Sequence, residues 1–383
     1  MCIRDRLGGA LTPPVAAGGR LVVARKDAHQ VICLDAASGA ERWRFTAGGR
    51  IDSPPTLHEG LALFGCADGW VYALRASDGA LAWRLRGAPQ ERLVVAFGQL
   101  ESAWPVHGSV LVQGGAVHFA AGRSSYLDGG IHVYSADVKD GRILSRKCIY
   151  SPDPETGLQP PQKGPQELPG ALSDILVGSN RGVTMRHLRV DADGGKNPGH
   201  LLCTAGFLDA TWFNRTPWSL GHAAGQLLVF DDGTAYGVQA YADAKRWEFF
   251  YPGKGYTLFA ADRRAKAQRT GKKAKRPPDR WRLRVPIRVT AMVLAGERLF
   301  IAGPPDVVDP DDPWAAFEGR KGSMLWALAA SDGQKLAERA LPALPVFDGL
   351  IAAARRLYLS TRDGRVLCLG GEQQAFEEGA IKR

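Results

Sequence analysis

The sequence predicts an all-β protein, a β-propeller built from four-stranded sheets called blades. Three observations point to this fold. A ten-residue phrase occurs twice at a spacing of 40 residues, as LDAASGAERW at 34–43 and as LRASDGALAW at 74–83. Around each phrase, short apolar runs alternate with turns rich in Gly and Asp, a pattern typical of β-hairpins. A repeat of about 40 residues with about four strands in each copy is typical of propeller blades.

The first two copies of the repeat have the same order of parts. Each begins with a Pro-containing segment, continues with two apolar runs and ends with a turn and a Trp-bearing strand. The apolar runs are Leu21–Ala24 and Val31–Leu34 in the first copy, and Leu61–Phe64 and Val71–Leu74 in the second. Each apolar run has the length and composition of a strand.

Three further copies follow the same pattern, at 103–145, 291–338 and 347–370. Between residues 171 and 262 the pattern is weak, and we assign two blades to that stretch. The sequence therefore predicts a propeller of about seven blades, within a range of six to eight.

The repeated phrase predicts a turn followed by a docking strand. Its glycine recurs in four copies, at Gly39, Gly79, Gly141 and Gly333. Glycine adopts the left-handed backbone of such a turn without the steric cost that other residues carry. Trp43 and Trp83 bear the largest side chains of the phrase, and we expect them to cover the joints between neighbouring blades.

The two ends of the chain predict how the ring closes. RDRLGGALTPP at 4–14 resembles FTAGGRIDSPP at 45–55, which is the end of a fourth strand, whereas the last copy stops without a Trp strand. We therefore expect residues 1–11 to complete the last blade, which would hide sheet edges. The predicted propeller spans residues 1–371, and the polar residues 372–383 form a tail.

Two segments interrupt the repeat and are predicted to be insertions. Residues 151–170 contain six prolines, and residues 263–284 contain eleven Lys or Arg and one acidic residue. The second segment therefore accounts for the whole net charge of +10. A charge confined to one loop indicates a solvated insertion rather than a surface for specific nucleic-acid binding. Binding of a polyanion by this loop is the alternative.

The motif Leu/Ala-Asp-x-x-Ser/Asp-Gly-x-x-x-Trp, preceded by Ser/Thr-Pro-Pro and Gly-x-Leu, resembles the repeat of the pyrroloquinoline-quinone-like (PQQ-like) β-propeller family. The resemblance covers residues 12–145 and 291–370. It implies the propeller fold. It implies no single function, because the repeat occurs both in quinone-dependent alcohol dehydrogenases and in non-catalytic propellers.

The resemblance also supplies a test for catalysis. The dehydrogenases of this family hold the quinone between a Trp and a disulfide of adjacent cysteines, beside a calcium ion bound by Glu, Asn and Asp. This chain has six scattered cysteines, no adjacent pair and no His spacing typical of a metal site. We therefore predict a non-catalytic binding or scaffolding module without cofactor or metal. A PQQ- and calcium-dependent alcohol or sugar dehydrogenase is the alternative.

Two loops that break the repeat are the predicted ligand or partner sites. The first is GRSSYLDGG at 122–130, and the second is GFLDATWFNRTPW at 206–218. The candidate binding residues in them are Arg123, Tyr126, Asp128, Trp212, Asn214, Arg215 and Trp218. Aromatic faces beside such polar groups suit sugars, planar molecules or peptides. In the alternative interpretation, the aromatic rings fill blade joints and the charged groups hold the loops in place.

Proteins with this repeat are commonly exported, so the resemblance implies an extracytoplasmic location, periplasmic or secreted. The first residues, MCIRDR, lack the apolar stretch of a signal peptide, and we expect the chain to be an N-terminally truncated part of a larger protein. No apolar run reaches the ~18 residues of a membrane helix. We expect a monomer that binds a protein or a small molecule through a propeller face or its loops.

Overall fold

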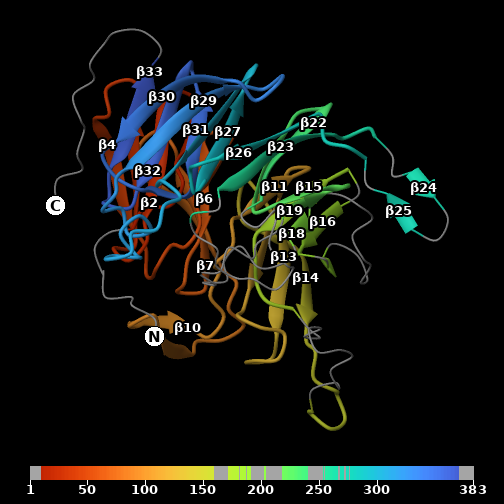
Figure 1. Cartoon of the computed structure of the whole chain (residues 1–383). Helices are drawn as coiled ribbons and strands as arrows, with labels where there is room; N and C mark the ends of the chain where they lie inside the picture. The colour runs from red at the N-terminus through yellow and green to blue at the C-terminus, as the bar shows by residue number, and fades with distance from the viewer. Residues whose placement is uncertain are drawn as a thin grey trace. The chain divides into compact units, whose positions relative to one another are not determined.

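The computed structural model describes residues 10–158, 171–180, 182–186, 188–190, 202–203, 218–239, 253, 255–265, 268–270, 273–275 and 277–370. These residues form strands, turns and irregular connections, and none of them lies in an α-helix (Figure 1). The chain divides into two compact units, residues 1–197 with 206–209 and the remaining residues.

The first unit contains four antiparallel sheets and one separate hairpin, and strands that are consecutive in the chain are neighbours in each sheet. The first sheet consists of β1 (Val15–Ala17), β2 (Arg20–Arg25), β3 (Gln30–Asp35) and β4 (Glu41–Thr46). The second consists of β5 (Thr56–His58), β6 (Leu61–Gly65), β7 (Trp70–Arg75) and β8 (Leu81–Arg86). The third consists of β11 (Leu111–Gln113), β12 (Ala116–Ala121), β13 (Ile131–Asp137) and β14 (Ile143–Ile149). The fourth consists of β15 (Leu176–Ser179), β16 (Gly182–Met185) and β17 (Leu188–Arg189), and the hairpin of β9 (Leu93–Ala96) and β10 (Gln99–Ser102).

The second unit contains four more sheets with the same simple order. They are β18 (Leu202–Cys203), β19 (Trp218–Leu220) and β20 (Ala223–Gly225); β21 (Leu227–Phe230), β22 (Thr234–Gln239), β23 (Tyr256–Asp262) and β26 (Trp281–Val285); β27 (Ala291–Ala295), β28 (Arg298–Gly303), β29 (Ser323–Ala329) and β30 (Lys335–Leu341); and β31 (Pro345–Ala353), β32 (Arg356–Thr361) and β33 (Val366–Gly370). A short hairpin of β24 (Gln268–Thr270) and β25 (Lys273–Lys275) lies in the connection from β23 to β26.

In both units consecutive sheets lie next to one another, mostly along their first strands. In the first unit β1 contacts β5, β5 contacts β11, and β11 contacts β15. In the second unit β19, the middle strand of its sheet, contacts β21, and the first strands β21, β27 and β31 contact one another in turn. Four-stranded antiparallel sheets that meet along their first strands are propeller blades. The fold is therefore the all-β propeller type that the sequence predicts.

The described residues form eight sheets of this kind, five with four strands and three with three strands, at the upper end of the expected range. Three of them, β15–β17, β18–β20 and the sheet that begins with β21, start where we expected two blades. The repeat is faint there because the strands are short, with two to four residues in each strand of the first two sheets. Short strands give little periodicity for sequence analysis to detect.

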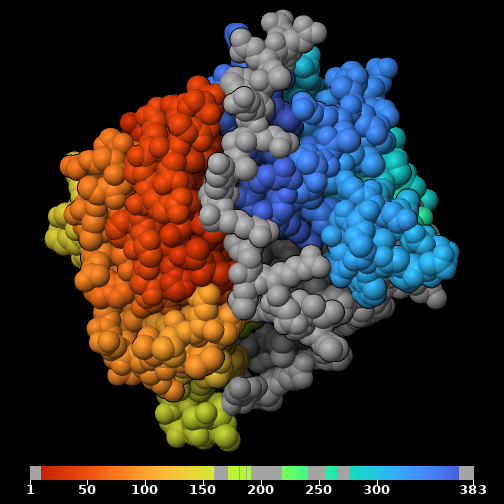
Figure 2. Space-filling model, turned by 90° about the vertical axis from the view of Figure 1, so that its left-hand side faces the viewer, coloured from red at the N-terminus to blue at the C-terminus, as the bar shows by residue number. Residues whose placement is uncertain are grey.

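Apolar cores lie between neighbouring sheets. Between the first and second sheets, Val22 and Cys33 pack with Phe64 and Tyr72, whose rings stack with centroids 5.2 Å apart. Cys33 is a fully buried side chain, whereas Cys368 of β33 is only half-buried. In the space-filling view the first and second sheets, red and orange, form one continuous surface (Figure 2).

A tryptophan on the fourth strand closes three of the joints between sheets. In each case the indole N–H donates a hydrogen bond to the first carbonyl after the third strand of the next sheet. The three pairs, with their N···O distances, are Trp43 to Ala76 (3.0 Å), Trp83 to Val138 (3.1 Å) and Trp281 to Ala330 (3.0 Å). An indole in this place buries a large apolar area and satisfies its single polar atom.

The glycine of the repeated phrase lies under the tryptophan ring of the preceding sheet. A Cβ atom on Gly79 would lie 2.7 Å from the Trp43 ring, and one on Gly141 would lie 2.8 Å from the Trp83 ring. The corresponding distance for Gly333 and Trp281 is 3.1 Å. The Gly and the Trp of the phrase therefore meet across consecutive copies. The ten residues are repeated because each copy has two roles. Its Trp packs on the Gly of the next copy, and its Gly receives the Trp of the copy before it.

Some predictions fall wholly or partly outside the described residues. The structure does not describe residues 1–9, which carry most of the predicted closing strand. It also leaves out most of the Pro-rich insertion and the predicted tail. Closure by residues 1–11 and a single propeller over 1–371 stay predictions. The basic segment 263–284 is in part a strand, because its last residues belong to β26, which pairs with β23 from Ala260↔Trp281 onward.

We expect Gly79→Ala to destabilise the protein more than Gly39→Ala. Both glycines have φ of +74°, so either alanine brings a backbone cost of ~1–2 kcal/mol. Only Gly79 lies against an indole, and overpacking there adds ~1–3 kcal/mol. Around Gly39 no atom of the described residues lies within 4 Å of the new Cβ. Urea unfolding of both variants measures the difference, and equal losses would contradict the proposed ring–glycine contact.

Candidate functional site

The hairpin of β9 and β10 stands apart from the four-stranded sheets of the first unit (Figure 1). It lies in the connection from the second sheet to the third, with the sequence ERLVVAFGQLES at 91–102. Phe97 and Gly98 form its two-residue turn, with φ of +52° and +74°. Positive φ at both turn residues matches the right-handed twist of the two strands. It is an unusual conformation for a phenylalanine.

One face of this hairpin presents large apolar side chains to solvent. Val95 is 78% exposed and Leu100, its partner in the strand register, is 63% exposed. Leu93 and Phe97 are 57% and 41% exposed. Single exposed apolar residues are common on protein surfaces, but four on one hairpin make a patch. We call β9, β10 and these four side chains the apolar hairpin.

The opposite face of the apolar hairpin carries a buried carboxylate. Glu101 is fully buried, and Val94, its register partner, packs on the core between the second and third sheets. Arg123 donates a hydrogen bond from Nη2 to Oε2 of Glu101 over 2.7 Å. Arg50 forms an ion pair, with its Nε 3.0 Å from the other carboxylate oxygen, without the alignment of a hydrogen bond. Two guanidinium groups thus neutralise one buried carboxylate.

The same two arginines belong to a closed ring of charged and polar side chains. Arg50 Nη2 lies 3.1 Å from Asp52 Oδ2, and the same oxygen lies 2.5 Å from His107 Nδ1. His107 Nε2 lies 3.4 Å from Arg123 Nη1. With Glu101 the ring has five members, which come from three separate connections and from the apolar hairpin. We call it the charge ring.

The charge ring holds the apolar hairpin on the sheets beneath it. Arg50 and Asp52 lie between the first and second sheets, and Arg123 lies in the β12–β13 connection of the third. Buried charges are tolerated when each is paired, and loss of one partner leaves another charge unpaired. Arg50 also stacks on the turn, with its Cζ 3.8 Å from the centre of the Phe97 ring. This cation–π contact fixes the residue with the unusual backbone.

A second tie joins the hairpin to the first sheet. Gln99 Oε1 lies 2.7 Å from His29 Nε2, in the β2–β3 turn. Its amide also donates to the Asp27 carbonyl over 3.4 Å. The apolar hairpin is therefore held from both sides, by the first sheet and by the third.

Two ionisable groups near the ring have shifted pKa values. Burial by itself would raise the pKa of Asp52, but the hydrogen bond from His107 and the positive charges of His107, Arg50 and Lys26 outweigh it and lower that pKa. Burial lowers the pKa of Lys26, and the neighbouring Arg50 charge adds to this effect, while Asp52 and Asp27 oppose it. The ring therefore favours the carboxylate form of Asp52.

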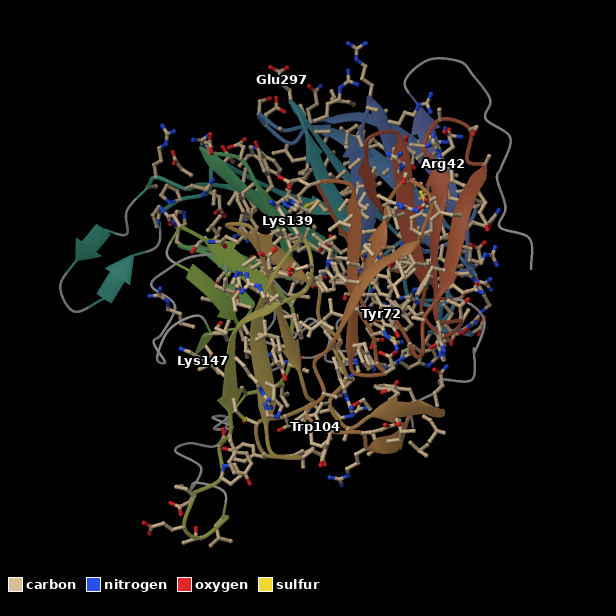
Figure 3. The ribbon with its side chains drawn as sticks, turned by 180° about the vertical axis from the view of Figure 1, so that it is seen from behind. Arg42, Tyr72, Trp104, Lys139, Lys147 and Glu297 are labelled. Carbon is tan, nitrogen blue, oxygen red and sulfur yellow. The ribbon has the colours of Figure 1, made fainter. Side chains whose placement is uncertain are left out.

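The structure places two of the three predicted residues of the 122–130 loop beside the hairpin. Arg123 belongs to the charge ring, and Asp128 forms a 2.9 Å ion pair with Arg92, directly before β9. The Asp128 carbonyl accepts a hydrogen bond from the indole of Trp104 (Figure 3) over 2.8 Å. The Tyr126 hydroxyl is buried and has no hydrogen-bond partner among the described residues. These contacts hold loops in place, and ligand binding by the three residues stays a prediction.

The predicted residues of the 206–218 loop are not brought into this site by any described contact. Trp212, Asn214 and Arg215 lie outside the described residues. Trp218 is the first residue of β19 in the second unit, where it pairs with Cys203 and Gly225.

Sequence reasoning missed the apolar hairpin and four members of the charge ring. The hairpin has a sequence signal, because apolar residues alternate in RLVVAFGQLES around a Phe-Gly turn. The sequence has no signal for which face of the hairpin meets solvent, since alternation alone does not distinguish the two faces. Arg50 and Asp52 lie about 50 residues before Glu101 and His107, and only the packing of the sheets brings the two pairs together.

Among the described residues, no group of three or more His, Cys, Asp or Glu side chains is arranged to hold a metal ion. Cys33, Cys66, Cys148 and Cys368 are free thiols. In the same part of the chain no helix has the length and apolar character needed to cross a membrane.

Blades joined by an indole on a glycine, in sheets that repeat about every 40 residues, define a propeller of the PQQ-like repeat type. Residues 4–159 match a family model described as outer membrane protein assembly factor BamB. Over these residues the chain is similar to proteins of the PQQ-like repeat family.

Individual relatives are distant. Outer membrane protein assembly factor BamB of Moranella endobia (strain PCIT) is 35% identical over 78 residues, which is 20% of this chain and 19% of that relative. The match therefore spans about a fifth of the relative's length. Among solved structures, the computationally designed Ika8 protein has a TM-score of 0.51 at 12% identity, with 95% of this chain and 96% of that one covered. The quinohemoprotein alcohol dehydrogenase of Comamonas testosteroni has a TM-score of 0.49 at 14% identity, over 93% of this chain and 71% of that one.

We expect Glu101→Gln to destabilise the protein by ~3–5 kcal/mol, because it leaves two guanidinium groups beside each other without the charge that balances them. The matched control is Glu91→Gln, which removes an exposed carboxylate ten residues earlier and is expected to change stability by less than ~0.5 kcal/mol. Urea unfolding measures both. A small effect of Glu101→Gln would show that the ring does not hold the hairpin.

We expect the protein to lose stability as the pH is lowered below 3.8, the ordinary pKa of an aspartate. Asp52→Asn should make the loss of stability smaller. The pKa of Asp52 is lower in the folded protein, so the unfolded chain binds the proton first as the pH falls. The stabilisation is present above the unfolded pKa and is lost as the pH falls through the folded pKa. Thermal unfolding between about pH 6 and about pH 3 measures it. Identical curves for the variant and the wild type would exclude a contribution from Asp52.

Proposed function

We propose that this protein is a non-catalytic binding module that docks a partner protein through the apolar hairpin. The observation that carries this proposal is the exposure of Leu93, Val95, Phe97 and Leu100 on one two-stranded hairpin. Solvent exposure of so much apolar surface is unfavourable, and contiguous apolar patches on soluble proteins mark interaction sites.

The way in which the hairpin is held supports an interface rather than a fraying loop. An exposed hairpin of two strands is marginally stable by itself. Here the buried face is fixed by Glu101 and the turn by Arg50, so the apolar face is presented in one geometry. Preorganisation of this kind lowers the entropic cost of binding.

The hairpin also offers main-chain hydrogen bonds. Among the described strands, β9 and β10 pair only with each other, so each has an outer edge. A partner strand that adds to such an edge gains backbone hydrogen bonds, and the apolar side chains add specificity. We propose a partner that supplies an extended segment with apolar side chains.

The relatives support a protein partner and a location in the cell envelope. The matching family model and the curated relative are both named as outer membrane protein assembly factors. We propose, by this likeness, that the chain acts outside the cytoplasm as a monomeric scaffold and uses no cofactor. The dehydrogenase alternative has no support from a particular group of described residues.

We expect Val95→Asp to weaken partner binding by at least tenfold, because a charge would be desolvated at the centre of the interface. The matched control is Leu336→Asp on β30, a residue that is 50% exposed and distant in the chain. A photoreactive phenylalanine analogue at Leu100 would first crosslink the partner in intact cells, and mass spectrometry would identify it. The purified pair then gives the affinities of wild type and both variants.

Two outcomes would contradict the proposal. Equal affinities for the Val95 and Leu336 variants would place the interface elsewhere. Saturable, calcium-dependent quenching of tryptophan fluorescence by pyrroloquinoline quinone would favour the dehydrogenase instead. We expect that titration to be flat, and unchanged thermal unfolding of Val95→Asp would show that the hairpin remains folded.

A further inference from the structure

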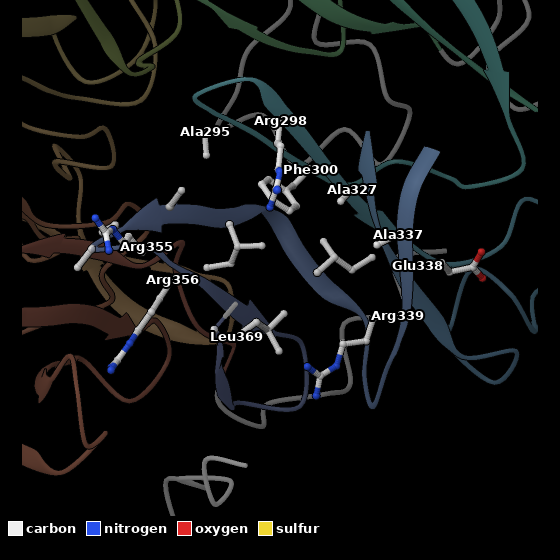
Figure 4. Close-up of a pocket in the computed structure, with 16 residues that line it drawn as sticks. Ala295, Arg298, Phe300, Ala327, Ala337, Glu338, Arg339, Arg355, Arg356 and Leu369 are labelled. Carbon is white, nitrogen blue, oxygen red and sulfur yellow. The ribbon is translucent and has the colours of Figure 1, made fainter. Parts of the chain in front are cut away.

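The second unit contains a cavity of about 700 Å³ between two neighbouring sheets, β27–β30 and β31–β33 (Figure 4). Its walls come from the face of β28, β29 and β30 on one side. On the other side they come from the β31–β32 turn, from Leu357 and from Leu369 near the end of β33. This volume lies within the range of ~300–1,000 Å³ that is typical of small-molecule sites.

The cavity lies at a joint where the tryptophan of the repeat is replaced. Ala337 follows Gly333 by four residues, as Trp43 follows Gly39. It also has the same place in the sheet, because Ala337 pairs with Ala327 of β29 as Trp43 pairs with Cys33 of β3. Both alanines line the cavity. A methyl group therefore stands where three other joints have an indole.

The three filled joints show what this place accommodates. At each of them a planar ring lies between two sheets, and its N–H donates to a backbone carbonyl of the next sheet. At the joint with Ala337, the cavity face is lined by Phe300 and Leu325, and the opposite wall by Leu357. Apolar walls around a slot of this origin favour a flat aromatic molecule.

The rim of the cavity is positively charged. Arg298, Arg339 and Arg355 line it, and none of them forms an ion pair with another described residue. The one acidic lining residue, Glu338, is paired with Lys335 at 2.9 Å. In Figure 4 the Glu338 carboxylate points away from the other lining side chains. A bound molecule would therefore meet guanidinium groups that no carboxylate of the rim neutralises, which favours an anion.

The turn that supplies Arg355 has an unfavourable backbone. Ala354 and Arg355 have φ of +48° and +61°. The corresponding turns of the first and third sheets have glycine pairs at such angles, Gly18–Gly19 and Gly114–Gly115. Left-handed backbone in residues with a Cβ costs free energy and is found most often at functional sites. The arginine is thus placed at the rim at a cost that glycine would avoid.

We propose that this cavity binds a planar aromatic molecule with an anionic group, its ring between the two sheets and its charge at the arginine rim. The proposal is independent of the apolar hairpin, which belongs to the other unit. It differs from the dehydrogenase alternative, because it needs no metal and no redox step.

Indole-3-acetate is the probe, because it combines the ring found at the other joints with a carboxylate. We expect saturable binding by isothermal titration calorimetry to the full chain. Ala337→Trp should weaken it by at least tenfold, because the new side chain enters the cavity. The matched control is Ala340→Trp on the same strand, which does not line the cavity and should bind as the wild type does.

A second variant separates the rim from the fold. Arg355→Gly should weaken binding of indole-3-acetate by about tenfold and leave binding of neutral indole unchanged, since only the charge is lost. It should also raise the melting temperature, because glycine relieves the turn. If Arg355 had only a structural role, Arg355→Gly would instead lower the melting temperature.

Two outcomes would overturn the proposal. The first is no binding to the wild type, and the second is equal binding to Ala337→Trp. Loss of neutral indole binding together with indole-3-acetate binding in Arg355→Gly would overturn the assignment of the charge to the rim.

Discussion

Three of the joints between sheets depend on one contact, the indole of one sheet on the glycine turn of the next. Apolar residues alone would stack these sheets, but they would fix neither their spacing nor their order. The indole does both, because it fills the joint and donates its only polar hydrogen to a defined carbonyl. The turn beneath it must be glycine, since a Cβ atom would meet the ring. The ten-residue phrase is repeated because each such joint needs the same Gly and Trp.

Two places depart from this regular packing. Where alanine replaces the tryptophan, as at Ala337, the joint opens into a cavity. Between the second and third sheets the connection is lengthened into the apolar hairpin, which no sheet covers. The chain compensates there with the charge ring, whose paired side chains tie three sheets to Glu101 of the hairpin. With only apolar contacts beneath it, the hairpin could bury its apolar face instead. The buried Glu101 carboxylate with its two arginines fixes which face of the hairpin packs on the sheets.

Much of the fold could be predicted because its determinants are local or periodic. The spacing of Gly39 and Trp43 predicts a turn and a strand, and the offset of 40 residues predicts the next sheet. The candidate site was less predictable. Arg123 and Asp128 attracted attention as polar residues in an irregular loop, but their partners Glu101 and Arg92 belong to the hairpin, 36 or fewer residues away and without a motif. Nothing in their spacing indicates that they meet.

From the sequence alone one could predict the all-β propeller, the approximate number of sheets and the Trp and Gly at the joints. These follow from patterns of side-chain size and backbone freedom that repeat along the chain. Tertiary structure alone decided that five side chains from distant connections close the charge ring, that Leu93, Val95 and Leu100 face solvent, and that Ala337 leaves a cavity. Each of these depends on distances between sheets, and one-dimensional periodicity carries no information on which faces of separate strands come together.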